Sequence, residues 1–330
     1  MATPARTTRV PSGRSSRQAA YPAKPLWSRK DLLGTRDLSV REIELILDRA
    51  RAVRELSPKT GESSALRGER LGLIFTEPST RTRTSFETAA RNLGMEPLGF
   101  SVQNSSTLKG ESLLDTIRNL EALGTRFFVA RTEASGAIHS VAAQVRSHIV
   151  NAGDGAHEHP TQALLDAFTL RERLGRIAGL RVLIVGDILH SRVARSNIWA
   201  LLKLKARVTV CGPGTLLPAG IESWGVRIDL DLRRAIRDAD AVNVLRLQLE
   251  RQKENLFPSL SEYHRFYGLT QEVLSLANPR CLVLHPGPLN RDVEISSEVA
   301  DGPQSAILEQ VANGVRIRMA VLSLLGNRPA

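Results

Sequence analysis

The chain of 330 residues contains only two cysteines, Cys211 and Cys281. Two thiols are too few for a disulfide framework or for a zinc site with four cysteine ligands. Each cysteine borders an apolar run, so we expect both to be reduced core residues. The chain also lacks any apolar run near the roughly 20 residues that a membrane helix needs. These absences favour a soluble, cytoplasmic protein with no membrane partner.

Acidic residues are absent from the first 30 positions, which carry seven basic residues. Subtracting these seven charges from the net charge of +11 leaves +4 for the remaining 300 residues. Such a mildly basic body suits an enzyme with arginines in an anion-binding cleft better than a nucleic-acid-binding protein. The leading segment lacks the apolar region of a secretory signal. We predict a disordered basic tail over residues 1–28, although an organelle transit peptide has a similar composition.

Strand-like and helix-like patterns alternate along the rest of the chain, which is typical of parallel sheets with crossover helices. Strands are expected at 71–75, 98–100, 126–129, 180–187, 207–212, 239–245 and 281–285, and helices at 38–50, 86–93, 112–122, 161–174 and 306–325. Ser39 and Glu42 have the spacing of a capping box at the start of the first helix. We therefore predict an α/β fold of two doubly wound parallel-sheet domains, which bind ligands beyond the carboxyl ends of their strands.

The most informative motif is Phe75-Thr-Glu-Pro-Ser-Thr-Arg-Thr-Arg-Thr-Ser-Phe86, which joins an expected strand to an expected helix. Free N–H groups and the positive end of the helix dipole meet at such a turn. Ser79, Thr80, Arg81 and Thr82 add donors that suit a phosphate. A simple N-cap with solvated arginines is the alternative. The Gly-x-x-x-x-Gly-Lys pattern of nucleotide P-loops is absent, so this phosphate need not belong to ATP.

Further polar residues follow other expected strands or open helices, and a surface role is compatible with most of them. These candidates are Lys109, Arg131, His159, Gln162, Arg192, Arg246, Gln248 and the turn 285–291. His157, Glu158 and His159 suggest a metal site, but a His-x-His pair needs further ligands and the sequence has no second cluster of His and Cys. The bulky residues after Gly186 exclude the glycine pattern of a dinucleotide-binding turn.

Together these motifs resemble the aspartate/ornithine carbamoyltransferase family over about residues 30–325. Phe75-x-Glu-x-Ser-Thr-Arg-Thr82 is similar to the family's carbamoyl-phosphate signature, and His159-Pro-x-Gln162 to its second signature. The resemblance implies a carbamoyl-phosphate-binding domain at 29–160 with 306–330, and an aspartate-binding domain at 161–305. The C-terminal helix is then expected to pack back on the first domain.

Charge favours aspartate over ornithine as the acceptor within this family. Aspartate brings two carboxylates, for which Lys109, Arg192 and Arg246 supply positive charge, whereas ornithine would need an acid. Arg246-Leu-Gln248 and His285-Pro-Gly-Pro288 stand where ornithine enzymes typically show Ser-Met-Gly and His-Cys-Leu-Pro. Two alternatives stay open: a carbamoyltransferase for another amino acid, and a non-catalytic basic binding or scaffold protein.

The resemblance implies a reaction of pyrimidine biosynthesis without a metal or an organic cofactor. The α-amino group of aspartate attacks carbamoyl phosphate, which gives N-carbamoyl-L-aspartate and phosphate. The resemblance implies that the phosphate is bound by Ser79, Thr80, Arg81 and Thr82, and that the carbonyl oxygen is contacted by Thr82, Arg131 and His159. The carbamoyl NH₂ group is then contacted by Gln162 and by the carbonyls near Gly287 and Pro288. Aspartate is bound by Lys109, Arg192, Arg246 and Gln248.

The implied assembly is a homotrimer or a multiple of trimers, because the family takes the loop with Ser105 and Lys109 from a neighbouring subunit. The His-Pro-Gly-Pro turn is similar to forms that associate with dihydroorotase-type partners. The sequence leaves open whether a regulatory chain binds, and we expect no nucleic-acid partner.

Overall fold

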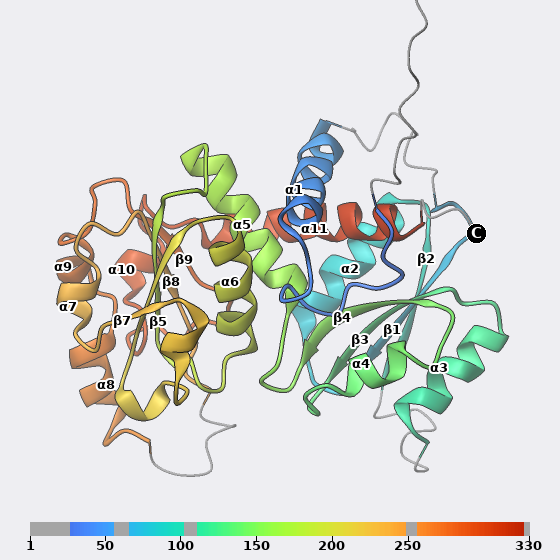
Figure 1. Ribbon diagram of the computed structural model, residues 1–330, viewed down its shortest axis with the longest axis horizontal. Helices are drawn as coiled ribbons and strands as arrows, with labels where there is room; N and C mark the ends of the chain where they lie inside the picture. Colours follow the sequence, from blue (N-terminus) through green and yellow to red (C-terminus); the bar gives the residue numbers. More distant parts are fainter. Residues whose placement is uncertain (1–26, 56–65, 102–110, 249–255, 327–330) are drawn as a thin grey trace, which may run out of the picture.

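The computed structural model describes residues 27–55, 66–101, 111–248 and 256–326. Its backbone forms two parallel sheets that lie side by side, each with helices on both faces (Figure 1). The predicted α/β class with two doubly wound sheets is confirmed. Apart from Trp27 and Ser28, the predicted basic tail lies outside the described residues. None of the helices in the described ranges is long and apolar enough to cross a membrane.

The first sheet has the strand order β2-β1-β3-β4. Its elements are α1 (Val40–Glu55), β1 (Arg70–Phe75), α2 (Thr80–Asn92), β2 (Glu96–Ser101), α3 (Leu113–Ala122), β3 (Phe127–Thr132), α4 (Ala137–Ala142) and β4 (His148–Asp154). Alternate side chains of β1 enter two cores, with Leu73 packing in the cluster of Phe86 and Ile74 in that of Ile117. Burial on both faces explains why this strand reads as a continuous apolar run.

The second sheet has the strand order β7-β6-β5-β8-β9. Its strands are β5 (Arg181–Val185), β6 (Arg207–Cys211), β7 (Arg227–Ile228), β8 (Ala241–Val244) and β9 (Leu282–Leu284). The helical segments around it are α6 (Arg192–Lys203), η4 (Gly214–Leu216), η5 (Ile221–Trp224), α7 (Leu232–Ala235), α8 (Leu260–Tyr267), α9 (Gln271–Leu274) and α10 (Ser297–Ala300). Cys211 and Cys281 are buried and reduced, as expected.

Two long helices, α5 (Pro160–Leu174) and α11 (Ile307–Gly326), lie where the two sheets meet (Figure 1). Helix α11 packs against α1, α2 and α5, which confirms that the C-terminal helix returns to the first domain. One core cluster contains Leu71 of the first sheet, Ile184 of the second, Phe168 of α5 and Leu322 of α11. The two sheets are therefore joined by continuous apolar packing.

Several elements differ from the sequence predictions. The helices α4, α6 and α8 and the short segments β7, η4, η5, α7, α9 and α10 were not predicted, and β4 and α2 differ for clear physical reasons. Strand β4 was not predicted, because Asn151-Ala-Gly-Asp154 interrupts its apolar pattern with residues that rarely occur in strands. Helix α2 begins at Thr80, six residues before the predicted start, with Ser79 at its N-cap. Its first turns are rich in threonine, which has a low helix propensity, so packing of Phe86 and Ala89 stabilises a helix that propensity alone would not predict.

Candidate active site

The loop after β1 begins beside Arg131. Phe75 pairs with Arg131 in the register of β1 and β3, and the backbone N–H of Thr76 donates to the Arg131 carbonyl at 3.0 Å. The next strand in sequence, β2, lies on the other side of β1. This is the topological switch point of the sheet, where α/β proteins place their ligands.

Glu77 of this loop connects the two sheets. Its Oε2 atom accepts hydrogen bonds from Arg131 Nε at 3.0 Å and from Arg192 Nη2 at 2.5 Å. Arg192 is the first residue of α6, and its side chain is only 5% exposed. Arg192 Nη1 also donates to the Gly155 carbonyl at 3.2 Å, so the guanidinium is held on two sides. A β-carbon at position 153 would lie 2.8 Å from Arg192 Nε, which explains the glycine there.

His159 is buried at the N-cap of α5. Its backbone N–H donates to Ser196 Oγ at 2.8 Å, and Ser196 in turn donates to Glu158 at 2.7 Å. Burial, together with the charges of Arg131, Arg192 and Arg318, holds the pKa of His159 well below its usual range. The imidazole is therefore neutral near pH 7 and is available as a hydrogen-bond donor without carrying a charge.

Arg81 meets the proline-rich turn that follows β9. A β-carbon built on Gly287 would lie 3.0 Å from Arg81 Cζ, so the turn after β9 touches a side chain from the first turn of α2. Partial burial and the charge of Arg246 lower the pKa of the Arg81 guanidinium. Since guanidinium groups remain charged at neutral pH, the charges of Arg81 and Arg246 repel each other here. An anion between them would relieve this repulsion.

Several predicted residues therefore converge at the carboxyl ends of both sheets: Arg81, Arg131, His159, Arg192, Arg246 and the turn at Gly287. Ser79 makes no side-chain capping bond, Thr80 is exposed and Thr82 is buried. Gln248 donates to the His190 carbonyl at 3.2 Å, and Gln162 to Asp166 at 2.9 Å. The predicted residues Ser105 and Lys109 lie outside the described residues.

Sequence reasoning assigned no role to Glu77 or to Asp166. Glu77 lies inside the motif from Phe75 to Phe86, whose hydroxyl groups and arginines predicted an anion site. Its two partners, Arg131 and Arg192, are remote in sequence, so no local pattern indicates the pairing. Asp166 follows Gln162 by one helical turn and is fully buried. A buried position for an acid on an otherwise apolar helix face is a signal that sequence periodicity could have supplied.

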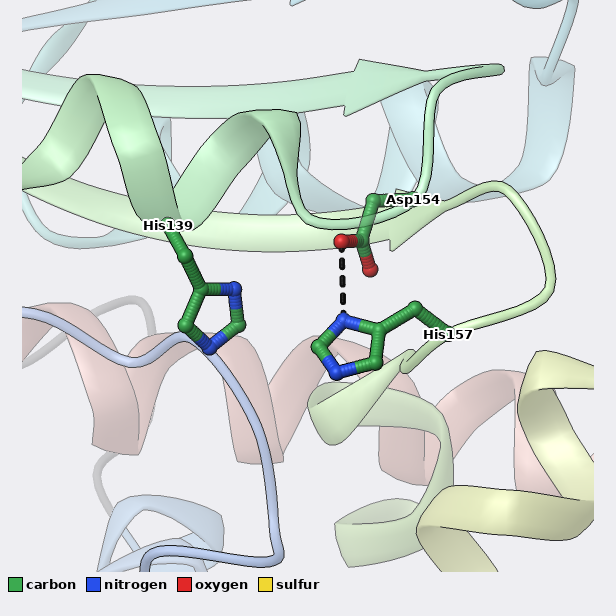
Figure 2. A group of neighbouring side chains, drawn as sticks. All are labelled: His139, Asp154 and His157. Atoms are coloured by element: carbon green, nitrogen blue, oxygen red, sulfur yellow. Dashed lines mark hydrogen bonds and ion pairs between the residues drawn. The ribbon is translucent and has the colours of Figure 1, made fainter.

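His157 lies beside His139 and Asp154 (Figure 2). The Asp154 oxygens accept from Asn151 Nδ2 at 2.8 Å, Glu158 N at 3.1 Å, Gly136 N at 2.8 Å and His157 Nδ1 at 3.0 Å. Four donors occupy the acceptor positions of one carboxylate. The cluster thereby supports the loop that carries His159.

Two family models match the chain. The carbamoyl-P binding domain of aspartate/ornithine carbamoyltransferases matches residues 30–172, and the Asp/Orn binding domain matches residues 178–325. The aspartate carbamoyltransferase catalytic subunit of Moorella thermoacetica is 54% identical over 298 residues, covering 90% of this chain and 97% of the relative. The same subunit of Halothermothrix orenii is 53% identical over 301 residues, covering 91% and 96%.

Solved structures of both branches of the family have the same fold. Aspartate transcarbamoylase from Trypanosoma cruzi, in complex with N-(phosphonacetyl)-L-aspartic acid, has a TM-score of 0.82 at 30% identity, covering 92% of this chain and 97% of that one. Ornithine carbamoyltransferase from Pyrococcus furiosus has a TM-score of 0.81 at 29% identity, covering 91% and 98%. The chain belongs to the aspartate/ornithine carbamoyltransferase family.

Proposed function

We propose that this chain transfers the carbamoyl group of carbamoyl phosphate to the α-amino group of L-aspartate. The products are N-carbamoyl-L-aspartate, a pyrimidine precursor, and phosphate. Relatives that share about half of their residues with this chain are named aspartate carbamoyltransferase catalytic subunits. These names support aspartate as the acceptor.

The observation that carries the proposal is the bridge from Arg131 through Glu77 to Arg192. Through this bridge, Arg131 of the proposed carbamoyl-phosphate-binding domain lies close to Arg192 of the proposed aspartate-binding domain. Carbamoyl transfer needs this neighbourhood, because the amine and the carbonyl carbon have to meet between two anionic substrates.

The described residues suggest how each part of the reaction is assisted. Arg81 and the amino-terminal turn of α2, with Ser79, Thr80 and Thr82, bind the phosphate. Arg131, neutral His159 and Thr82 donate to the carbonyl oxygen, on which negative charge grows as the amine attacks. No proton has to leave His159 for this, and the departing phosphate accepts the amine proton.

The remaining roles concern the substrate amino groups and the acceptor. Gln162 and the carbonyls near Gly287 and Pro288 accept from the carbamoyl NH₂. Arg192, Arg246 and Gln248 orient aspartate, and Lys109 with Ser105 of a neighbouring subunit completes the site. The minimum active unit is accordingly a homotrimer that works in the cytoplasm, with a regulatory or dihydroorotase-type chain as a further partner. The proposed reaction requires no metal ion, and we expect neither a nucleic acid nor a membrane as a partner.

We assign carbamoyl-phosphate binding to residues 29–160 with 306–330, and aspartate binding to residues 161–305. The matched regions support a division next to α5, and the packing of α11 on α1 and α2 supports the return of the last helix to the first domain.

A steady-state assay with carbamoyl phosphate and either amino acid tests the proposal. We expect carbamoyl-aspartate and phosphate in equal amounts, and little product with ornithine. Comparable turnover of ornithine would overturn the acceptor assignment. Absence of transfer to either amino acid, with salt-sensitive nucleic-acid binding that survives removal of residues 1–28, would favour the scaffold alternative.

A further inference from the structure

Asp166 is buried at the centre of a cluster of four side-chain amides, which we call the amide cluster. Its Oδ1 atom accepts from Gln162 Nε2 at 2.9 Å and from Gln310 Nε2 at 2.6 Å. Its Oδ2 atom accepts from Asn197 Nδ2 at 2.8 Å and from Asn243 Nδ2 at 3.2 Å. The members come from α5, α6, β8 and α11, and Asp166 has no exposed surface.

The carboxylate determines which way each amide points. An ionised carboxylate only accepts hydrogen bonds, so each amide has to turn its NH₂ group toward Asp166 and its carbonyl oxygen away. For Gln162, this leaves Oε1 as the acceptor on the side away from Asp166. For Gln310, Oε1 accepts the backbone N–H of His285 at 2.9 Å.

His285 carries this connection into the proline-rich turn. The Gly287 N–H donates to His285 Nδ1 at 2.8 Å, so that nitrogen is the acceptor of the ring. Nε2 then bears the proton and lies 3.3 Å from Glu294 Oε1. A chain of hydrogen bonds therefore runs from Gly287 through His285 and Gln310 to Asp166 Oδ1. The same oxygen accepts the hydrogen bond from Gln162.

We propose that Asp166 is the positioning residue for recognition of the carbamoyl NH₂ group. Through one carboxylate oxygen it orients the Gln162 carbonyl and places the carbonyls near Gly287 and Pro288. The Gln162 carbonyl and the carbonyls of the turn then point their oxygen atoms toward the substrate. These oxygens accept hydrogen bonds from an NH₂ group, whereas a methyl group in the same place would leave them without a donor. This inference rests on the proposed function and names a residue that touches no substrate atom.

A buried polar cluster also stabilises the contact between helices, so the test has to separate recognition from stability. Acetyl phosphate provides the separation, because it carries a methyl group where carbamoyl phosphate carries NH₂. We compare the KM of carbamoyl phosphate with the inhibition constant of acetyl phosphate in wild type and in Asp166→Ala. We expect the preference for the carbamoyl compound to fall at least ~10-fold, the scale of one hydrogen bond to a site built for it.

The matched control is Asn243→Ala, which removes a donor from the other oxygen of Asp166. This variant should be less stable, while the preference for carbamoyl phosphate over acetyl phosphate changes by less than about threefold. The reason is that Gln162 and Gln310 both bond to Oδ1 of Asp166 and not to Oδ2. If Asp166→Ala does not fold, Gln310→Met replaces it as the test. This variant removes the connection between Asp166 and His285 and leaves the hydrogen bond between Asp166 and Gln162 in place. Equal weakening of both phosphates, or an unchanged preference in a folded variant, would overturn the proposal. Wild-type protein that does not carbamoylate aspartate would instead overturn the proposed function.

Discussion

The α-carbon of Gly287 lies against the guanidinium of Arg81, so that a β-carbon at position 287 would be 3.0 Å from Cζ of the arginine. Gly287 also has a φ of +66°, which residues with a β-carbon rarely adopt. One position therefore combines a backbone requirement with a contact to Arg81, the arginine that we propose binds the phosphate.

Gly287→Ala should reduce both stability and activity. The left-handed backbone costs about 1 kcal/mol for alanine, and displacement of Arg81 should lower kcat/KM for carbamoyl phosphate about tenfold or more. Gly220→Ala is the control, since Gly220 has a φ of +71° and nothing within 4 Å of the added carbon. Urea unfolding and steady-state kinetics of both variants give the comparison. A similar loss of activity in the two variants would contradict a specific contact.

Arg81→Ala should lower turnover by at least ~10²-fold, which is the scale for losing a preorganised donor that stabilises developing charge. Arg83→Ala is a suitable control on the same helix, because Arg83 pairs with Glu87 at 3.0 Å. That variant should lose only a surface ion pair, worth less than about 1 kcal/mol. Near-normal turnover of a folded Arg81→Ala protein would rule out the phosphate-binding role.

Mixed trimers test whether Lys109 serves a neighbouring site. Lys109→Ala and Arg81→Ala proteins should each be inactive alone. After dissociation and random reassembly in equal amounts, about a quarter of the shared sites would combine two intact contributors in a cyclic trimer. Carbamoyl-aspartate formation measures the recovery. Confirmed subunit exchange without any recovery would contradict a shared site.

The neutral state of His159 should appear in the pH dependence of stability. Below about pH 6.5 the unfolded chain binds a proton at this position that the folded chain does not, so acid lowers the free energy of unfolding by up to about 1.4 kcal/mol per pH unit. His159→Gln lacks this effect. The stability of wild type relative to the variant should therefore fall between about pH 6.5 and 5 in urea titrations. A constant difference would mean that His159 titrates equally in both states.

Much of the site follows from the sequence because its residues lie in short local motifs at strand ends. Phe75 to Phe86 predicts an anion site from neighbouring residues, and the parallel sheet then brings Arg131 beside it. The capping box at Ser39 and Glu42 also forms as predicted, with the Ser39 N–H donating to Glu42 Oε2 at 2.7 Å.

The remainder depends on contacts between distant segments, which no local pattern contains. The partners of Glu77 are 54 and 115 residues away along the chain. Gln310 is 144 residues from Asp166, and its glutamine side chain has no distinguishing sequence context. Only the packing of α5 against α11 brings the two together.

The position of α11 has a consequence for biosynthesis of the protein. This helix covers α1 and α2, yet the ribosome makes it only after every strand of the second sheet. The inner faces of α1 and α2 therefore emerge without their cover, and the first half cannot complete its core in the order in which it is synthesised. Final assembly of the anion-binding half is delayed until α11 has left the ribosome, and until then its exposed apolar surface is a natural target for chaperones.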